Sequence, residues 1–236
     1  MVSPLSIKHQ PWINAPATRA VMQALCADGG AARFVGGCVR NALMGVPVED
    51  IDIATPLTPD EVVRRIKAAG MNAVGTGIEH GTVTAISHAT PDKVATFEIT
   101  TLRRDVSTDG RRATVAFSTD WAEDAQRRDF TMNAIYAEAD GEVRDVIGGL
   151  PDLNARRVRF IGDPAQRIAE DYLRILRLFR FHAAYGSGEI DDAGLRACAA
   201  AKDQIKTLSG ERIQKEMLRL LATALPVPVL RPMAAS

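Results

Sequence analysis

The sequence has few cysteines and histidines, and their positions give no metal or disulfide pattern. Cys26, Cys38 and Cys198 are the three cysteines in 236 residues; they form no C-x-x-C pair, and none of the four histidines lies near them at ligand spacing. Zinc sites and disulfide-rich secreted domains repeat these residues at short intervals. The pattern therefore predicts reduced thiols and argues against a zinc site or a disulfide framework.

A long hydrophobic run is also lacking. No stretch approaches the length of about 20 apolar residues that a membrane-spanning helix needs, and residues 1–10 lack the apolar core of a signal peptide. From these absences we expect a soluble protein located in the cytoplasm.

The chain has no net charge, with 29 basic and 29 acidic residues. No overall positive field therefore indicates a nucleic-acid partner. The basic residues are nevertheless grouped, which permits local contacts with phosphates, although charged clusters are more often just solvated surface. The groups are Arg103 and Arg104, Arg111 and Arg112, and Arg127 and Arg128.

The most informative stretch that the chain does contain is residues 33–54. Residues 33–35 are predicted to end a buried strand, and Gly36 and Gly37 permit a sharp turn because they have no Cβ. Residues 39–44 then predict a short helix that ends at Gly45. A helix beginning directly after such a turn presents backbone N–H groups and a positive dipole end to an anion.

Two carboxylates follow on the next predicted strand. Alternation places Asp50 and Asp52 on one face and Ile51 and Ile53 on the other. Neighbouring carboxylates repel each other unless a cation lies between them, and Mg²⁺ prefers a few carboxylates together with substrate phosphates. An Asp-x-Asp pair or a Gly-Gly turn alone is common on ordinary surfaces. Together they predict a metal–triphosphate site.

These residues read GG-x-x-R-N-x-L-x-G followed by D-x-D, and they resemble the nucleotidyltransferase superfamily that includes DNA polymerase beta. More narrowly, they resemble the first motif of bacterial tRNA nucleotidyltransferases (CCA-adding enzymes) and their poly(A) polymerase relatives. Asn41 stands where that family more often has Asp, and we interpret the position as structural.

The resemblance implies an α/β fold, in which a DNA polymerase beta-like head with a mixed β-sheet is followed by a small all-helical neck. It also implies a two-ion Mg²⁺ site on Asp50 and Asp52. Glu98, on a later predicted strand, is a candidate third ligand, and an exposed strand glutamate explains it equally well. Gly36, Gly37 and Arg40 would hold the triphosphate.

A second motif, residues 127–134, matches the family's R-R-D-F-T-x-N-A at all seven fixed positions. Arg127 and Arg128 supply cations near phosphates, Asp129 can accept hydrogen bonds from ribose hydroxyls, and Asn133 can hold either the turn or the sugar. A structural Arg–Asp salt bridge is the alternative interpretation.

The polar, Arg-rich stretch 101–119 is predicted to be a loop. Loops this long are more often functional than inert. The resemblance implies a flexible loop that helps the enzyme change from adding C to adding A. The matching residues are Arg103, Asp105, Asp109, Gly110 and Arg111.

From residue 151 the patterns are helical, which predicts a head over 1–150, a neck over 151–225 and an irregular tail over 226–236. The neck is predicted to contain helices over 163–185, 191–203 and 209–223. The first resembles the family's E-D-x-x-R-x-x-R motif, so Asp171, Arg174 and Arg177 are predicted to recognise the nucleobase; a solvated charged face is the alternative. Three prolines argue against helix in the tail.

The expected function is template-independent addition of C and/or A to the 3′ end of tRNA, by two-metal phosphoryl transfer from CTP or ATP. The usual body and tail domains that bind RNA have no counterpart in this sequence, so we expect weak binding of tRNA. A poly(A) polymerase, a truncated nucleotide-binding module with little RNA-directed activity, and a subunit that borrows RNA binding from another chain remain alternatives. The oligomeric state is open.

Overall fold

The computed structural model describes residues 5–77, 81–90, 93–109, 112–224 and 226–235. The chain divides into two compact units. Unit 1 consists of Met1–Asp105, Val115–Arg127 and Asn133–Ile147, and unit 2 of Val106–Thr114, Arg128–Met132 and Gly148–Ser236. The predicted division at residue 150 lies close to the start of the last segment of unit 2.

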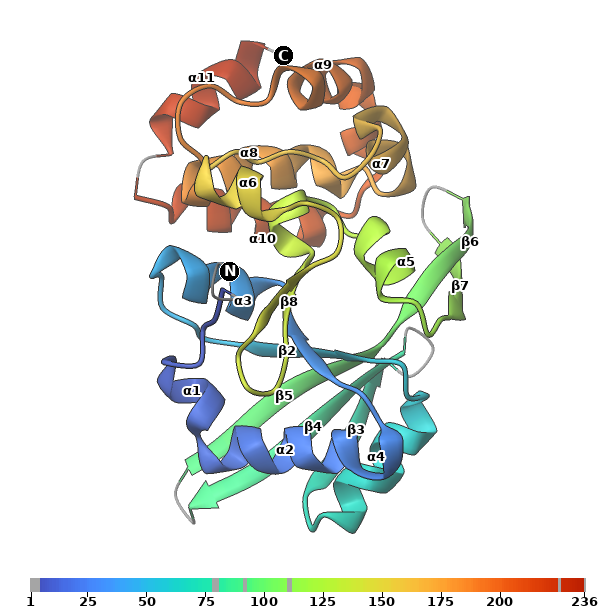
Figure 1. Cartoon of the computed structure of the whole chain (residues 1–236). Helices are drawn as coiled ribbons and strands as arrows, with labels where there is room; N and C mark the ends of the chain where they lie inside the picture. The colour runs from blue at the N-terminus through green and yellow to red at the C-terminus, as the bar shows by residue number, and fades with distance from the viewer. Residues whose placement is uncertain (1–4, 78–80, 91–92, 110–111, 225, 236) are drawn as a thin grey trace. The chain divides into compact units, whose positions relative to one another are not determined.

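Unit 1 is built on a seven-stranded mixed sheet with the order β3-β4-β5-β2-β1-β8-β9 (Figure 1). All neighbours are antiparallel except β2 and β5, which are parallel. The strands are β1 (Arg33–Val35), β2 (Ile51–Thr55), β3 (Asn72–Gly77), β4 (Thr82–Thr90), β5 (Lys93–Thr101), β8 (Ile135–Ala137) and β9 (Val143–Asp145). The mixed α/β head predicted from the sequence is therefore confirmed.

Two helices of unit 1 pack together on the sheet. The helices of unit 1 are α1 (Pro11–Asn14), α2 (Pro16–Cys26), α3 (Gly37–Met44), α4 (Pro59–Ala68) and α5 (Trp121–Gln126). α2 and α4 pack against each other and against β4, and α4 also contacts β3 and β5. Burial alternates along β2 and β5 at these positions. Ile53, Phe97 and Ile99 are fully buried, whereas Asp52 is half-buried and Glu98 is exposed. At β2 and β5, Ile53, Phe97 and Ile99 thus belong to the core, and Asp52 and Glu98 on the other face are accessible to a ligand.

The stretch predicted as a loop over 101–119 is largely extended. β6 (Arg103–Asp109) and β7 (Arg112–Phe117) form a separate two-stranded sheet. The loop prediction was wrong because it weighted the polar, Arg-rich composition over the β-branched Val and Thr residues of the stretch, which favour strands. The predicted loop residues Gly110 and Arg111 lie outside the described residues.

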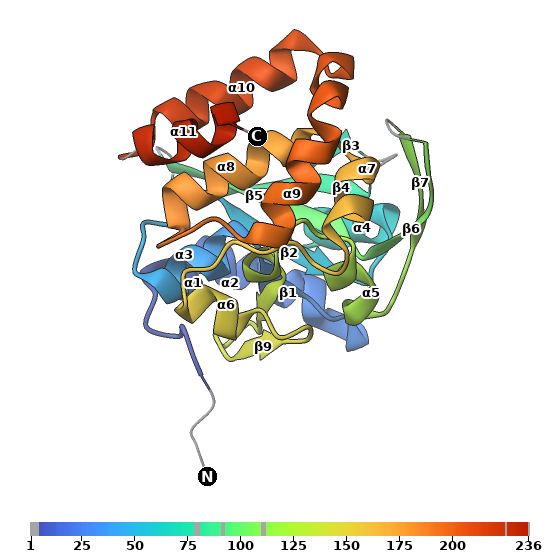
Figure 2. The same cartoon turned by 90° about the horizontal axis from the view of Figure 1, so that it is seen from above.

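Unit 2 is mainly helical (Figure 2). Its elements are α6 (Leu150–Asn154), α7 (Pro164–Glu170), α8 (Leu173–Tyr185), α9 (Asp192–Ala201), the 3₁₀ helix η4 (Lys202–Thr207), α10 (Gly210–Leu221) and α11 (Val227–Ala235). α8 packs against both α10 and α11. An aromatic cluster of Phe130, Phe160 and Phe181 supports this packing.

The single helix predicted over 163–185 is in fact two helices. Asp171 has an extended backbone, with φ −157° and ψ 106°, and it ends α7. Its carboxylate accepts a hydrogen bond from the Leu173 backbone N–H at 3.1 Å, so it helps to start α8. Asp171 and Arg174 therefore do not share one continuous helical face, as the periodicity had suggested.

The tail predicted to be irregular is also helical, as α11. Two of its three prolines lie where a missing N–H costs no helical hydrogen bond: Pro226 precedes the helix and Pro228 lies in its first turn. Val229 of α11 is buried, and α11 packs against α8. This packing offsets the cost of Pro232 inside the helix. In the part of the chain that the structure describes, no helix is both long and apolar enough to cross a membrane.

Candidate active site

The glycine turn and the strand that carries Asp52 lie together. Gly36 has φ 72° and ψ −127°, a conformation that is open to glycine, and it caps α3 directly after β1. One residue into the helix, the buried Cys38 Sγ donates to the Val35 carbonyl at 3.3 Å and to the Asp52 carbonyl at 3.7 Å. The first turn of α3 therefore rests on β2 beside Asp52.

The Cys38 thiol is a packing and hydrogen-bonding group. Burial, followed by the negative charge of Asp52, raises the pKa of Cys38 to about 12. The thiol keeps its proton at neutral pH and remains a donor to the two carbonyls, so it joins α3 to both neighbouring strands.

Two of the predicted acidic residues are neighbours in the sheet. Asp52 and Glu98 are directly paired in the parallel β2–β5 register, and Thr84 of β4 is opposite Glu98. Paired residues point to the same face of a sheet, here the face opposite Ile53 and Phe97. Asp50 directly precedes β2 and is exposed.

The acidic residues suit a hard cation that also binds substrate. Within the described ranges, no group of three or more His, Cys, Asp or Glu residues is arranged to hold a metal ion, so Glu98 joins no such cluster. Mg²⁺ is usually held by one or two carboxylates, with substrate phosphates and water completing its shell. Asp52, half-buried on β2, and the exposed Asp50 directly before it fit that requirement, because their oxygen atoms are the ligands that Mg²⁺ prefers.

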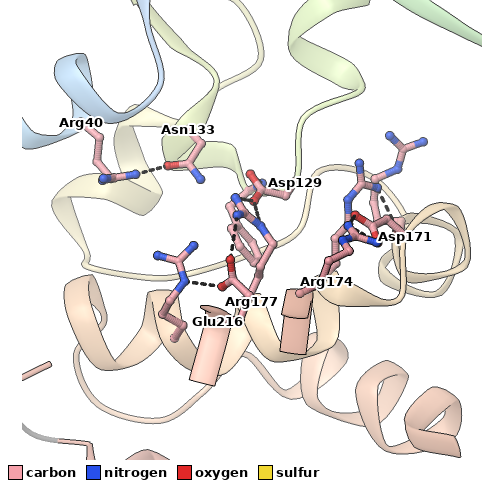
Figure 3. Close-up of polar contacts among 11 residues, drawn as sticks. Arg40, Asp129, Asn133, Asp171, Arg174, Arg177 and Glu216 are labelled. Atoms are coloured by element: carbon pink, nitrogen blue, oxygen red, sulfur yellow. Dashed lines mark hydrogen bonds and ion pairs between the residues drawn. The ribbon is translucent and has the colours of Figure 1, made fainter. Parts of the chain in front are cut away.

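Arg40 links the two sequence motifs of unit 1. Its guanidinium is buried and donates to the Asn133 side-chain oxygen at 2.5 Å (Figure 3). The same group donates to Asn41 Oδ1 at 2.8 Å, and Asn41 in turn donates to the Pro47 carbonyl at 2.8 Å. The predicted phosphate ligand Arg40 is thus held inside the fold, and Asn41 supports it structurally.

In unit 2, Asp129 belongs to a chain of charges that joins three segments. Its carboxylate accepts from the Phe130 N–H at 2.8 Å and from Arg177 Nε at 2.9 Å. The buried Glu216 of α10 lies 3.7 Å from Arg177 Nη1 and accepts from Arg180 Nε at 2.5 Å (Figure 3). Burial lowers the pKa of Arg177, but the carboxylates of Asp129 and Glu216 outweigh it and raise the pKa above its ordinary value. Arg177 therefore remains a cation.

The two residues predicted to recognise the base have separate partners. Arg174 donates to Glu170 Oε2 at 2.5 Å and to the Arg167 carbonyl at 2.7 Å. Asp171 pairs with Arg212 of α10 at 2.8 Å. Sequence analysis gave no site role to Arg180, Arg212 and Glu216, nor to Glu170, the first residue of the E-D-x-x-R-x-x-R motif.

The remaining predicted site residues are Arg128 and the residues of β6. Arg128 is half-buried, and Arg103 is half-buried at the start of β6. Asp105 and Asp109 also lie in β6. The helix predicted over 209–223 is present as α10. Spacing is the signal that could have revealed its charged face, since Arg212 and Glu216 are four apart and therefore lie on one side of the helix.

Comparison with known proteins gives a consistent result. The family described as "Poly A polymerase head domain" matches residues 32–159. The human mitochondrial CCA tRNA nucleotidyltransferase 1 is 45% identical over 192 residues, covering 80% of this chain and 43% of that protein. The CCA-adding enzyme of Limosilactobacillus reuteri strain DSM 20016 is 39% identical over 232 residues, covering 98% of this chain and 55% of the relative.

A solved structure has the same architecture. The Bacillus stearothermophilus CCA-adding enzyme in complex with CTP superposes with a TM-score of 0.81 at 31% identity, covering 93% of this chain and 51% of that one. The chain thus spans about half the length of the curated relatives that it matches.

Proposed function

Because the chain belongs to the poly(A) polymerase head-domain family, we propose that it is a nucleotidyltransferase that adds C and/or A to the 3′ end of tRNA. CTP and ATP would be the nucleotide substrates, and no nucleic-acid template would be needed. Unit 1 would act as the head that transfers the nucleotide, and unit 2 as the neck that selects the base.

One observation carries this proposal: the first turn of α3 rests on β2 beside Asp52. This contact brings the N-terminal end of a helix, which attracts phosphate, next to carboxylates that suit Mg²⁺. Asp50 and Asp52 would hold the metal ions. Bound Mg²⁺ would supply activation of the RNA 3′-hydroxyl and stabilisation of the leaving pyrophosphate.

The residues of the chain would position the triphosphate. Backbone N–H groups in the turn at Gly36 and Gly37 donate to anions without needing a charged side chain. Arg40 would act mainly by fixing α3 against Asn133, since its guanidinium is buried in those contacts. Arg128 and Asp129 would serve the phosphates and the ribose, and Asp129 is already oriented by Arg177.

Asp171 and Arg174 would select the base. A carboxylate only accepts hydrogen bonds, and a guanidinium only donates them. Cytosine and adenine each offer an amino donor beside a ring-nitrogen acceptor, which matches this pair. Uracil and guanine have a carbonyl oxygen in place of the amino group, and each unsatisfied polar group costs about 1–3 kcal/mol. The CTP complex of the similar B. stearothermophilus enzyme supports CTP as one substrate.

The test is incorporation of each labelled nucleotide separately into tRNA that lacks its 3′ CCA sequence. We expect Mg²⁺-dependent addition from CTP and ATP, none from UTP or GTP, and loss of addition on chelation with EDTA. Long A tails from ATP alone, on tRNA and unrelated RNA alike, would indicate a poly(A) polymerase instead. Nucleotide binding without any incorporation would indicate a binding module and contradict the proposed enzyme.

A further inference from the structure

One face of α10 contacts the charged residues of α7 and α8. Arg212 and Glu216 lie four residues apart on this helix, so their side chains project from the same side. Arg212 binds Asp171, and Glu216 binds Arg180 and lies near Arg177. α10 thus supports the residues proposed to select the base, although neither Arg212 nor Glu216 belongs to the matched base-recognition motif.

The contacts of Asp171 define how its carboxylate is oriented. Oδ1 accepts from the Leu173 N–H at 3.1 Å and from Arg212 Nη2 at 3.1 Å. Oδ2 accepts from the same Arg212 nitrogen at 2.8 Å. A carboxylate has about two acceptor directions on each oxygen. With these contacts, Oδ1 has both directions occupied, and Oδ2 retains one for a further donor.

The Asp171–Arg212 pair is too exposed to be explained by stability. The Arg212 side chain is 44% exposed and that of Asp171 is 33% exposed. Ion pairs of this exposure contribute little to folding, because solvent screens them and two side chains must be ordered. The main effect of this ion pair is therefore to orient the carboxylate of Asp171.

We propose that Arg212 is a positioning residue that sets base selectivity by fixing the carboxylate of Asp171. The inference rests on the proposed function. With Arg212 and Leu173 holding three of the acceptor directions, Oδ2 is the atom that accepts the amino group of cytosine or adenine. A carboxylate held in this way cannot turn aside when uracil or guanine presents an oxygen, so the repulsion is retained. Without Arg212 the carboxylate can rotate, and the penalty against the wrong base decreases.

The experiment compares Arg212→Ala and Arg212→Lys with a matched control, Arg219→Ala. Arg219 is exposed on the same face of α10, seven residues further along, and none of the ion pairs found among the described residues joins it to Asp171. Equilibrium binding of CTP, UTP, ATP and GTP to the full chain is measured by calorimetry with Mg²⁺ and without RNA, so that no turnover contributes.

We expect Arg212→Ala to lower the preference for CTP over UTP about tenfold, the factor for one hydrogen bond to a charged group. CTP affinity itself should change less, and the thermal midpoint should stay close to wild type. Arg212→Lys should restore part of the preference, because the ammonium still donates to the carboxylate. Arg219→Ala should leave the preference unchanged.

Equal loss of preference in Arg212→Ala and Arg219→Ala would overturn the inference, since only the charge of the helix would matter. An unchanged preference in Arg212→Ala would overturn it as well. If Arg212→Ala does not fold, the same comparison is made with Arg212→Gln, where an unchanged preference has the same meaning. Wild-type chain that binds all four nucleotides equally would overturn this inference and the base selection in the proposed function. A selective wild type with a selective Arg212→Ala would leave the proposed function intact.

Discussion

Two adjacent glycines at the start of α3 have different physical roles. Gly36 adopts φ 72° and ψ −127°, which side-chain-bearing residues rarely reach. Gly37 is different, because a Cβ added there would meet only Arg40 Nη2, at 3.8 Å. The backbone conformation of the fold requires Gly36. Gly37 is not required by the fold, and its missing side chain leaves space for a ligand.

This difference gives a paired prediction. Gly36→Ala should destabilise the protein by about 1–3 kcal/mol through backbone strain, measured by urea unfolding. Gly37→Ala should leave the free energy of unfolding nearly unchanged but weaken Mg²⁺–CTP binding, because its methyl group would occupy the space beside the turn. Normal CTP binding by folded Gly37→Ala protein would show that the triphosphate does not approach this turn.

Asp52 should be needed for chemistry and dispensable for folding. Its side chain is half-buried on the open face of the sheet, opposite the buried Ile53. Asp52→Ala should abolish Mg²⁺-dependent nucleotide incorporation while the thermal midpoint stays close to wild type. Glu98→Ala, which changes the neighbouring carboxylate in the register, serves as the comparison. An Asp52→Ala protein that keeps activity within a few-fold of wild type would refute the two-metal assignment.

At the scale of elements, local patterns predicted most of the sheet and its helices. The sequence alone predicts strands within residues 72–100 and a hairpin at Asp140–Gly141, from alternation and turn chemistry, and the structure has them as β3, β4, β5, β8 and β9. The cap of α4 by Thr58 is likewise present, since its Oγ1 accepts from the Glu61 N–H at 3.4 Å. These features depend on residues that are close in sequence.

The features that were missed depend on contacts that periodicity does not contain. The break between α7 and α8 comes from a side chain that caps the second helix from outside it, although the apolar spacing continues through the break. α11 forms despite its prolines because Val229 is buried in packing. Arg212 and Glu216 reach partners 41 and 36 residues away. Such pairings are set by tertiary structure, so the partners of Arg212 and Glu216 could not be predicted, although the helix that carries them was.

Glu216 lies on α10 with Arg212, but it is buried, and we expect it to contribute to stability. Its carboxylate is buried between Arg180 and Arg177. Glu216→Gln would leave the half-buried Arg180 without its counter-charge, and breaking a buried ion pair costs about 3–5 kcal/mol. Urea unfolding should show a lower midpoint with an unchanged slope. Glu211→Gln, on the exposed surface of the same helix, should change the free energy of unfolding by less than about 0.5 kcal/mol. Equal effects of the two changes would mean that burial of Glu216 does not contribute.

For the whole molecule, the balance of charge bears on the tRNA binding that the proposed function requires. The chain has equal numbers of basic and acidic residues, and several arginines of unit 2 are already paired with carboxylates. These pairs are Arg174 with Glu170, Arg177 with Asp129, Arg180 with Glu216, and Arg212 with Asp171. Arginines held in this way add little positive potential at the surface, so these four contribute little to contacts with the phosphates of a long RNA.

We therefore expect weak and salt-sensitive binding of tRNA. Each phosphate contact releases counterions, and the affinity falls with salt in proportion to the number of contacts. With about four contacts, raising the salt from about 50 to about 200 mM should weaken binding about 100-fold. Fluorescence anisotropy of labelled tRNA across this range measures the slope, and Mg²⁺–CTP binding at the same salt concentrations controls for loss of folding.

The opposite outcome would be equally informative about the molecule. Tight tRNA binding that persists at high salt needs many simultaneous contacts, which the arginines paired within unit 2 do not offer. It would require either a larger basic surface than the ion pairs leave available or a second copy of the chain beside the first. Sedimentation of the protein with and without tRNA distinguishes the two, because only the second changes the number of chains for each RNA. A slope as steep as that of about eight contacts, from a monomeric complex, would contradict the argument that internal pairing limits RNA affinity.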